Sequence, residues 1–262
     1  MILDFQRWSM PPVLQLLCML LTFNVKVDHS PDVQFVEVFA GVAEISRACR
    51  AEGMVGSSHD ISYSSHFDLC NRTGFLLAIN ELLRAVPGSL CIFALCCNSY
   101  CRMSRSTSGR GILFPLGDTS KRFVREGNLL ASRLVLMLWI CASRNLIWLV
   151  EQPEGSAFPL HPRWQEFLEY CPAFTTSFWM GAFSGPTAKR HRLWSNCPKF
   201  LEGIWEAGGS MSRDALRALP GGPLVRKYKD KNGVARCSGL KDKLKASQLL
   251  GAYLALGLLV QK

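Results

Sequence analysis

The chain has 262 residues, enough to bury the core of one large domain or of one domain plus a small lobe. Hydrophobic residues make up 48% and charged residues 19%, a balance that suits a globular protein and excludes a disordered one. The formal net charge is +10, from 30 Lys and Arg against 20 Asp and Glu. An excess of this size favours polyanionic partners such as nucleic acid, and a basic surface without such a partner is the alternative.

The cysteines indicate a reducing environment. There are 11, an odd number, and several lie inside apolar runs, where a free thiol behaves as a small hydrophobe. We therefore expect no disulfide pattern and an intracellular location, the nucleus included. Four cysteines crowd together at 91–101, but they form no CxxC pair and have no histidine at ligand spacing, so the sequence predicts no metal site.

Residues 1–32 are expected to be an amino-terminal extension. Its apolar stretch, 13–23, is too short to span a bilayer. Arg7 precedes the stretch as in a signal peptide, but no small-x-small cleavage site follows it. We expect a helix packed on the domain, or an extension, without stable membrane association.

From residue 33 onward, strand-like and helix-like segments alternate, which predicts a mostly parallel, twisted sheet with helices on both faces. Apolar and β-branched runs predict strands at 34–39, 54–59, 90–95, 146–150, 174–180 and 192–195. Helical spacing of apolar residues predicts helices at 42–52, 75–86, 121–144, 162–170 and 244–260. Turn residues separate the last two strands, so we expect an antiparallel hairpin at the end of the sheet. The predicted architecture is one α/β domain over 33–262, with a polar loop at 98–118 and an irregular insertion at about 198–240.

The first strand runs into a turn, Phe39-Ala40-Gly41, that indicates cofactor binding. Glycine lets the backbone approach a ligand, and the amino terminus of the next helix faces it. Asp60, about 20 residues downstream and after the second strand, is placed to accept hydrogen bonds from ribose hydroxyls. Asp68 is a candidate to hold the exocyclic amine of a purine. A helix-capping Asp and a loop Asp are the alternatives.

Cys97 follows the third strand, at the carboxyl end where open α/β sheets bind ligands. It is a candidate nucleophile, and Arg102 and Arg105 are the positive charges expected to favour its thiolate. A structural thiol is the alternative, and Cys96 and Cys101 compete for the role.

Glu151 directly follows the strand at 146–150. An unpaired carboxylate is costly to bury, so this position favours a general acid over a packing residue, with a cap or a salt-bridge partner as the alternative. Gln152-Pro153 breaks the strand and is expected to fix the direction of the carboxylate.

Two clusters of arginines are candidates to contact nucleic acid. Alternation along the last strand places Arg190 and Arg192 on one side, as in a clamp on a backbone phosphate or a base, and a solvated turn is the alternative. Arg102, Arg105 and Arg110 follow Cys97. Together the clusters would place the net charge at the mouth of the sheet.

In their order, these segments resemble the carbon-5 cytosine DNA methyltransferases, a family with an S-adenosylmethionine-dependent Rossmann-like fold. Residues 39–41 resemble the family's cofactor turn, and Cys97-Asn98-Ser99-Tyr100 resembles its Pro-Cys-Gln-x-Phe loop. Glu151-Gln152-Pro153 resembles its Glu-Asn-Val, and Arg190-x-Arg192 resembles its Gln-x-Arg-x-Arg. Ser247-Gln248 is similar to its closing motif, so the resemblance covers residues 34–262.

The resemblance implies methyl transfer to cytosine in DNA, or in RNA, through a covalent cysteine adduct. Cys97 would be the nucleophile and Glu151 the acid, with a flipped-out base as substrate. The residues implied in cofactor binding are Phe39, Ala40, Gly41, Asp60, Asp68 and Ser247. Two other functions remain open: a methyltransferase of this fold without a covalent step, and a catalytically silent nucleic-acid-binding module.

Overall fold

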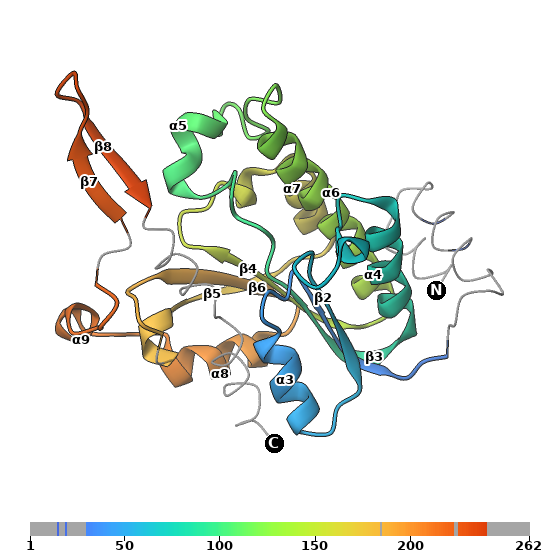
Figure 1. Ribbon diagram of the computed structural model, residues 1–262. Coiled ribbons are helices and arrows are strands. Elements are labelled where there is room, and N and C mark those ends of the chain that lie inside the picture. The colour runs from blue at the N-terminus through green and yellow to red at the C-terminus, as the bar shows by residue number, and fades with distance from the viewer. Residues whose placement is uncertain (1–14, 16–18, 20–29, 184, 223–224, 240–262) are drawn as a thin grey trace.

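The computed structural model describes residues 15, 19, 30–183, 185–222 and 225–239 (Figure 1). Most of the apolar stretch at 13–23, the helix predicted at 244–260 and Ser247 lie outside these residues.

A six-stranded sheet in the order β2-β1-β3-β4-β6-β5 forms the centre of the molecule (Figure 1). The first four strands pair in parallel, and β6 lies antiparallel between β4 and β5. The prediction of an α/β fold with a mostly parallel sheet that ends antiparallel is confirmed, and the topology is Rossmann-like. The strands are β1 (Val33–Val38), β2 (Gly56–His59), β3 (Ala85–Phe93), β4 (Ile147–Pro153), β5 (Phe174–Trp179) and β6 (Arg190–Ser195).

Helices cover both faces of the sheet, and each face has its own apolar core. Alternation along β4 sends Trp148 and Val150 to one core and Leu149 to the other. The first core is completed by α4 (Arg72–Arg84), α6 (Arg122–Ser143) and α7 (Pro162–Tyr170), and the second by α3 (Glu44–Ala51) and α8 (Pro198–Gly208). Short helices lie in the connections: η1 (Ser65–Phe67), η2 (Arg102–Ser104), α5 (Arg105–Ser108), η3 (Phe158–Leu160), η4 (Met180–Phe183) and α9 (Arg213–Arg217).

Helix α4 ends at Arg84, two residues before the predicted end. The residue before a proline avoids the helical conformation, and Val86 precedes Pro87. Strand β3 therefore begins at Ala85, and its register against β1 shifts before the buried run is reached. Helix α6 ends as its sequence suggests: Asn145 takes a left-handed conformation with φ 55°, and the Leu146 N–H donates to the Cys141 carbonyl at 2.9 Å.

The prediction that 198–240 is irregular is wrong for most of that segment. Pro198 occupies the first turn of α8, and Leu201 and Ile204, three residues apart, bury one side of it. Further along, β7 (Val225–Lys229) and β8 (Ala235–Gly239) form an antiparallel hairpin that projects from the body of the molecule (Figure 1). The turn between them is closed by the Asp230 carboxylate, which accepts the N–H groups of Asn232 and Val234.

Among the described residues, no helix combines the length and the apolar character needed to cross a membrane. The cysteines whose side chains are described all carry free thiols.

Candidate active site

The predicted site residues lie along one edge of the sheet. Strands β1 to β4 are parallel, so their carboxyl ends share that edge. The turn at 39–41 follows β1, Asp60 follows β2, Cys97 follows β3, and Glu151 lies near the end of β4.

The turn after β1 has a strained backbone. Phe39, Gly41 and Ala43 all have positive φ, at 61°, 55° and 56°. For residues other than glycine this conformation is uncommon, and such strain gathers at functional sites. A β-carbon on Gly41 would meet nothing within 4 Å, so open space lies beside the turn. These features suit the close approach of a ligand to the backbone.

Asp60 links the first two strand ends. Its carboxylate accepts the N–H of Gly41 at 2.8 Å through one oxygen and the N–H of Ser62 at 2.8 Å through the other. An ionised carboxylate has about four acceptor positions, so each oxygen keeps capacity for a further donor. The donor set therefore fits the hydroxyls of a ribose.

Asp68 is partly buried and has a local structural role. Its carboxylate accepts the Cys70 N–H at 2.8 Å, as in the loop-Asp alternative. Burial raises the pKa of the Cys70 thiol to about 11, and Asp68 adds to the rise. These contacts occupy part of the carboxylate and leave acceptor capacity for an amine.

Cys97 is partly exposed, but its surroundings do not favour the thiolate. Burial raises the pKa of the thiol to about 12, and the Glu151 carboxylate contributes to the rise. The cation that partly offsets it is Lys189, from the segment before β6. The sequence prediction assigned this charge to Arg102 and Arg105 and did not include Lys189. The same interaction shows that Cys97 and Glu151 lie within electrostatic reach of each other.

Glu151 is buried and pairs with a residue that sequence reasoning missed. Nδ1 of His191, on β6, shares a hydrogen bond with a Glu151 carboxylate oxygen. Burial lowers the pKa of His191, so near neutral pH the ring is uncharged. We assign the ring proton to Nδ1, so that the ring donates and the carboxylate oxygen accepts. Nε2 is then a bare acceptor, and it has no hydrogen-bond partner in the described part of the chain.

Arg190 and Arg192 share one face of β6, as the alternation predicts, but it is not the face of Glu151. In the register of β4 and β6, Arg192 lies opposite Gln152. Its guanidinium pairs with Glu154, just beyond β4. Arg190 is exposed and stacks over Trp179 at 5.3 Å. The two arginines therefore flank the site, and His191 between them completes it.

Two buried polar residues on the strands support the site. Gln152 donates to the Leu95 carbonyl and accepts the Ser156 hydroxyl at 2.9 Å, which ties the ends of β3 and β4 together. Glu37 accepts the N–H of Ser46 at 2.8 Å and its hydroxyl, which anchors α3 under the strained turn. Burial raises the pKa of Glu37. The sequence signal for both is a polar residue inside an apolar strand run.

Arg110 is structural and does not face a ligand. Its guanidinium is buried and donates to the Pro115 carbonyl and the Asn128 amide oxygen, each at 2.8 Å, and to Ser99. It also lies 3.9 Å from the centre of the Tyr100 ring. This contradicts the expected place of Arg110 in a basic cluster at the mouth of the sheet.

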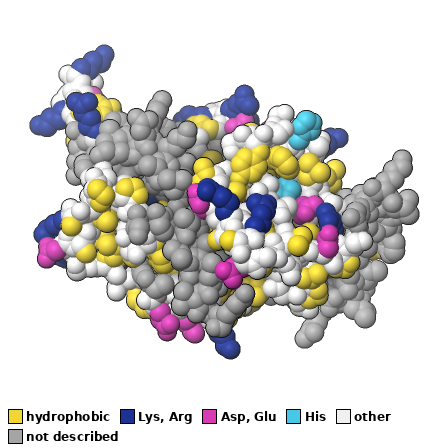
Figure 2. Space-filling view, turned by 60° about the horizontal axis from the view of Figure 1, so that its bottom comes forward, with side chains coloured by type: hydrophobic (Ala, Val, Ile, Leu, Met, Phe, Trp, Pro, Cys, Tyr) yellow, Lys and Arg dark blue, Asp and Glu magenta, His cyan; other side chains and the backbone are white. Residues whose placement is uncertain are grey.

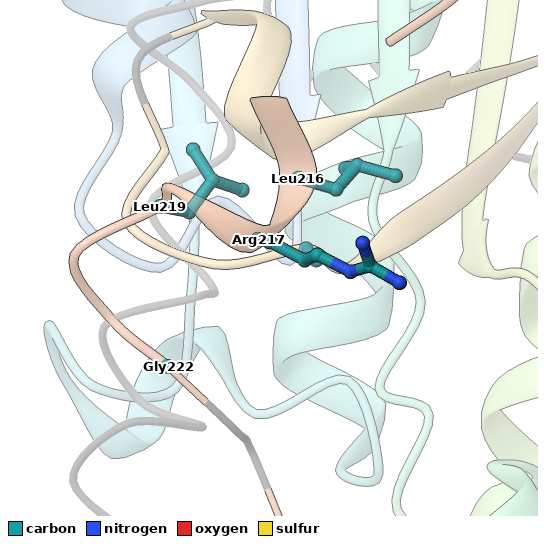
Figure 3. Close-up of a pocket in the computed structure, with 5 residues that line it drawn as sticks. Leu216, Arg217, Leu219 and Gly222 are labelled. Atoms are coloured by element: carbon teal, nitrogen blue, oxygen red, sulfur yellow. The ribbon is translucent and has the colours of Figure 1, made fainter. Parts of the chain in front are cut away.

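A cavity of about 280 Å³ outside this edge is lined by α9, the turn after it and Ala188 (Figure 3). Arg217 is the one charged residue among the described residues that line it, so this cavity does not match the predicted chemistry. No group of three or more His, Cys, Asp or Glu among the described residues is arranged to hold a metal ion.

No protein-family model matches the sequence, and no curated protein shows significant similarity to it. The topology is consistent with a Rossmann-like methyltransferase domain.

Proposed function

We propose that the protein transfers a methyl group from S-adenosylmethionine to carbon 5 of cytosine in a nucleic acid, DNA in preference to RNA. The observation that carries the proposal is a pairing of two half-sites on one sheet edge. One half is the strained turn joined to Asp60. The other is Cys97, in electrostatic reach of the buried Glu151.

The cofactor side would be formed by residues 39–41, Asp60 and Asp68. The turn offers its backbone with open space beside Gly41, and Asp60 retains acceptor capacity for the ribose hydroxyls. Asp68 would accept the adenine amine. When bound, the cofactor supplies a methyl group made electrophilic by its sulfonium. Ser247 lies outside the described residues and stays a prediction.

The protein's own chemistry begins at Cys97. Carbon 5 of cytosine is a poor nucleophile, so Sγ adds to carbon 6 and the displaced electron pair moves into the ring. Burial keeps the proton on the thiol, so this proton leaves as the bond forms. Glu151 accepts it and passes it to ring nitrogen 3. His191 is a positioning residue that holds the Glu151 carboxylate by its hydrogen bond.

Carbon 5, now activated, would take the methyl group, and the electron pair of the broken carbon–sulfur bond would stay with the cofactor sulfur as a neutral thioether. Loss of the proton from carbon 5 to solvent then restores the 5,6 double bond and expels the Cys97 sulfur, which recovers its proton from nitrogen 3 through Glu151. The chain ends the cycle unchanged, and one proton is released to solvent.

The test uses a DNA duplex that contains 5-fluorocytosine, incubated with the protein and S-adenosylmethionine. Fluorine on carbon 5 blocks the final elimination, so the covalent adduct accumulates and survives denaturation. We expect the adduct to be absent in Cys97→Ala and retained in the matched variant Cys96→Ala, whose thiol is exposed. Absence of the adduct in the unsubstituted protein, with cofactor binding intact, contradicts the covalent step.

The raised pKa of Cys97 favours a second candidate function, methyl transfer by the same fold without a covalent step. In that case Cys97→Ser retains turnover, whereas the covalent mechanism requires its loss. Failure to bind S-adenosylmethionine in calorimetry, with nucleic-acid binding intact, would instead indicate a silent binding module.

A further inference from the structure

The connection between β3 and α6 presents an apolar tip to solvent. Ile112, Leu113 and Phe114 are 83%, 84% and 70% exposed, more than any other large hydrophobic residue in the described ranges. Exposing adjacent large apolar side chains is unfavourable unless they bind something. We call residues 112–114 the apolar tip.

The tip is held in a fixed shape. Gly111 and Phe114 exchange two backbone hydrogen bonds of 3.2 Å, which close a tight turn. The buried Arg110 holds the Pro115 carbonyl at 2.8 Å, and Asn128 on α6 holds the Leu116 carbonyl at 2.9 Å. The turn is therefore ordered before it binds, so little conformational entropy is lost on binding. This favours a binding role for the turn.

Gly117 completes the base of the tip. It has φ 65°, and a β-carbon there would lie 2.5 Å from the Ser108 carbonyl oxygen. The backbone is packed too closely at this position for any other residue without movement of the loop.

Basic residues lie on both sides of the tip in the sequence. Residues 102–125 contain six Lys and Arg against one Asp, so this segment carries half of the excess positive charge of the chain. Arg110 is buried, and the other five are exposed: Arg102, Arg105, Lys121, Arg122 and Arg125. On the face drawn in Figure 2, by contrast, Lys and Arg lie in small groups among acidic and apolar side chains. A polyanion with an apolar interior is the complementary partner.

We propose that the apolar tip is a wedge that enters the base stack of a duplex nucleic acid while the neighbouring exposed arginines and Lys121 contact its phosphates. Apolar wedges flanked by basic groups unstack and kink duplexes in this way. Three side chains cover too little area for a stable protein interface, which buries about 800 Å² on each partner.

The wedge rests on the proposed function in one respect: the tip lies on the connection that begins at the proposed nucleophile, Cys97. The same connection begins at Cys97, and it is tied to the end of β4 by the Ala157 N–H, which donates to the Tyr100 carbonyl at 2.8 Å. Arg105 also donates to the Gly155 carbonyl at 2.9 Å. Unstacking beside the site would release a base toward Cys97.

The test measures binding to a short duplex with 2-aminopurine beside a cytosine, whose fluorescence rises on unstacking. The unsubstituted protein should bind and raise the fluorescence. The triple variant I112S/L113S/F114S should lose the rise and bind about tenfold more weakly. The control Ile61→Ser, at another exposed apolar position, should behave as the unsubstituted protein. The double variant R102Q/R105Q should reduce the salt dependence of binding, with a slope that falls by about 0.9 for each phosphate that the variant no longer neutralises.

Equal binding and equal fluorescence in the triple variant overturn the wedge. So does a result in which the tip is needed only for vesicles of phosphatidylserine and phosphatidylcholine, because the partner would then be an anionic membrane. Cys97→Ala separates this inference from the proposed function: it should abolish the 5-fluorocytosine adduct and leave the 2-aminopurine signal intact.

Discussion

At the scale of single residues, the chemistry of the site depends on burial. Burial favours the uncharged form of Cys97, His191 and His161, because a charge is costly in low-dielectric surroundings. Sequence shows which residues can titrate, but it does not show how much water surrounds them. The direction of these pKa shifts therefore comes from the structure.

Lys189 is expected to control the reactivity of Cys97. Removing its charge in Lys189→Met should raise the pKa of the thiol further, because the ammonium lowers it. Less thiolate is then present at a given pH, and alkylation of Cys97 by iodoacetamide should slow by about twofold to tenfold. Mass spectrometry of the peptide that contains Cys97 measures the rate. The control Arg102→Gln should leave the rate unchanged, and an equal slowing there would contradict the assignment.

His161 is expected to make the protein labile to acid. Its ring is buried, neither nitrogen has a hydrogen-bond partner among the described residues, and burial lowers its pKa from 6.5 to about 4. Between these values the unfolded chain binds a proton that the folded chain does not. The free energy of unfolding should therefore fall as the pH drops through this window, by at most about 3 kcal/mol.

Urea unfolding near pH 7 and near pH 4.5 measures this contribution. His161→Phe should lose that part of the pH dependence, while the exposed His66→Gln should keep it. If His161→Phe shows the full pH dependence, another group is responsible.

At the scale of elements, the turn between β1 and α3 has a strained backbone and is also the proposed place of cofactor binding. Gly41→Ala should lower the free energy of unfolding by about 1 kcal/mol, because a residue with a β-carbon is strained at φ 55°. The added methyl group would clash with no other residue, since nothing lies within 4 Å of it. It should also weaken S-adenosylmethionine binding measured by calorimetry. Gly111→Ala, likewise in open space but without a positive φ, should change neither quantity. An equal loss in both variants would mean that the turn at 39–43 has no special role.

The elements also show what periodicity can predict. The limits of α6 and α7 follow from apolar spacing and end signals, and the structure agrees with them to within a residue. The hairpin β7–β8 escaped prediction although Asn232-Gly233 is a strong turn signal, because its strands lack an alternating apolar face. His191 escaped because its partner Glu151 is 40 residues away, and only the register of β4 and β6 brings them together.

At the scale of the whole molecule, the sheet order assembles a site from residues more than 100 apart in the sequence. The strand-end positions of Gly41, Asp60, Cys97 and Glu151 could be predicted, because parallel neighbours share an edge. The partial burial that raises the pKa of the Cys97 thiol could not, because it depends on how neighbouring segments pack around the side chain.

Ligand binding to such an assembled edge should stabilise the entire fold. S-adenosylmethionine at about 100 times its Kd should raise the Tm by about 5–10 °C. Asp60→Asn should lose this ligand-dependent rise, whereas Asp214→Asn, at an exposed position on α9, should keep it. A rise that persists in Asp60→Asn would place the ligand elsewhere.

Strand β6 has a consequence for how this chain tolerates change in length. Arginines stand on both sides of His191, so a slip of one residue in either direction would present a permanent positive charge to Glu151 in place of a titratable ring. The same slip would move Leu193 out of its buried position. Insertions or deletions between β5 and β6 are therefore tolerated only when the loop accommodates them without a shift of β6. The burial of Leu193 thus fixes the register that keeps His191, two residues away, paired with Glu151.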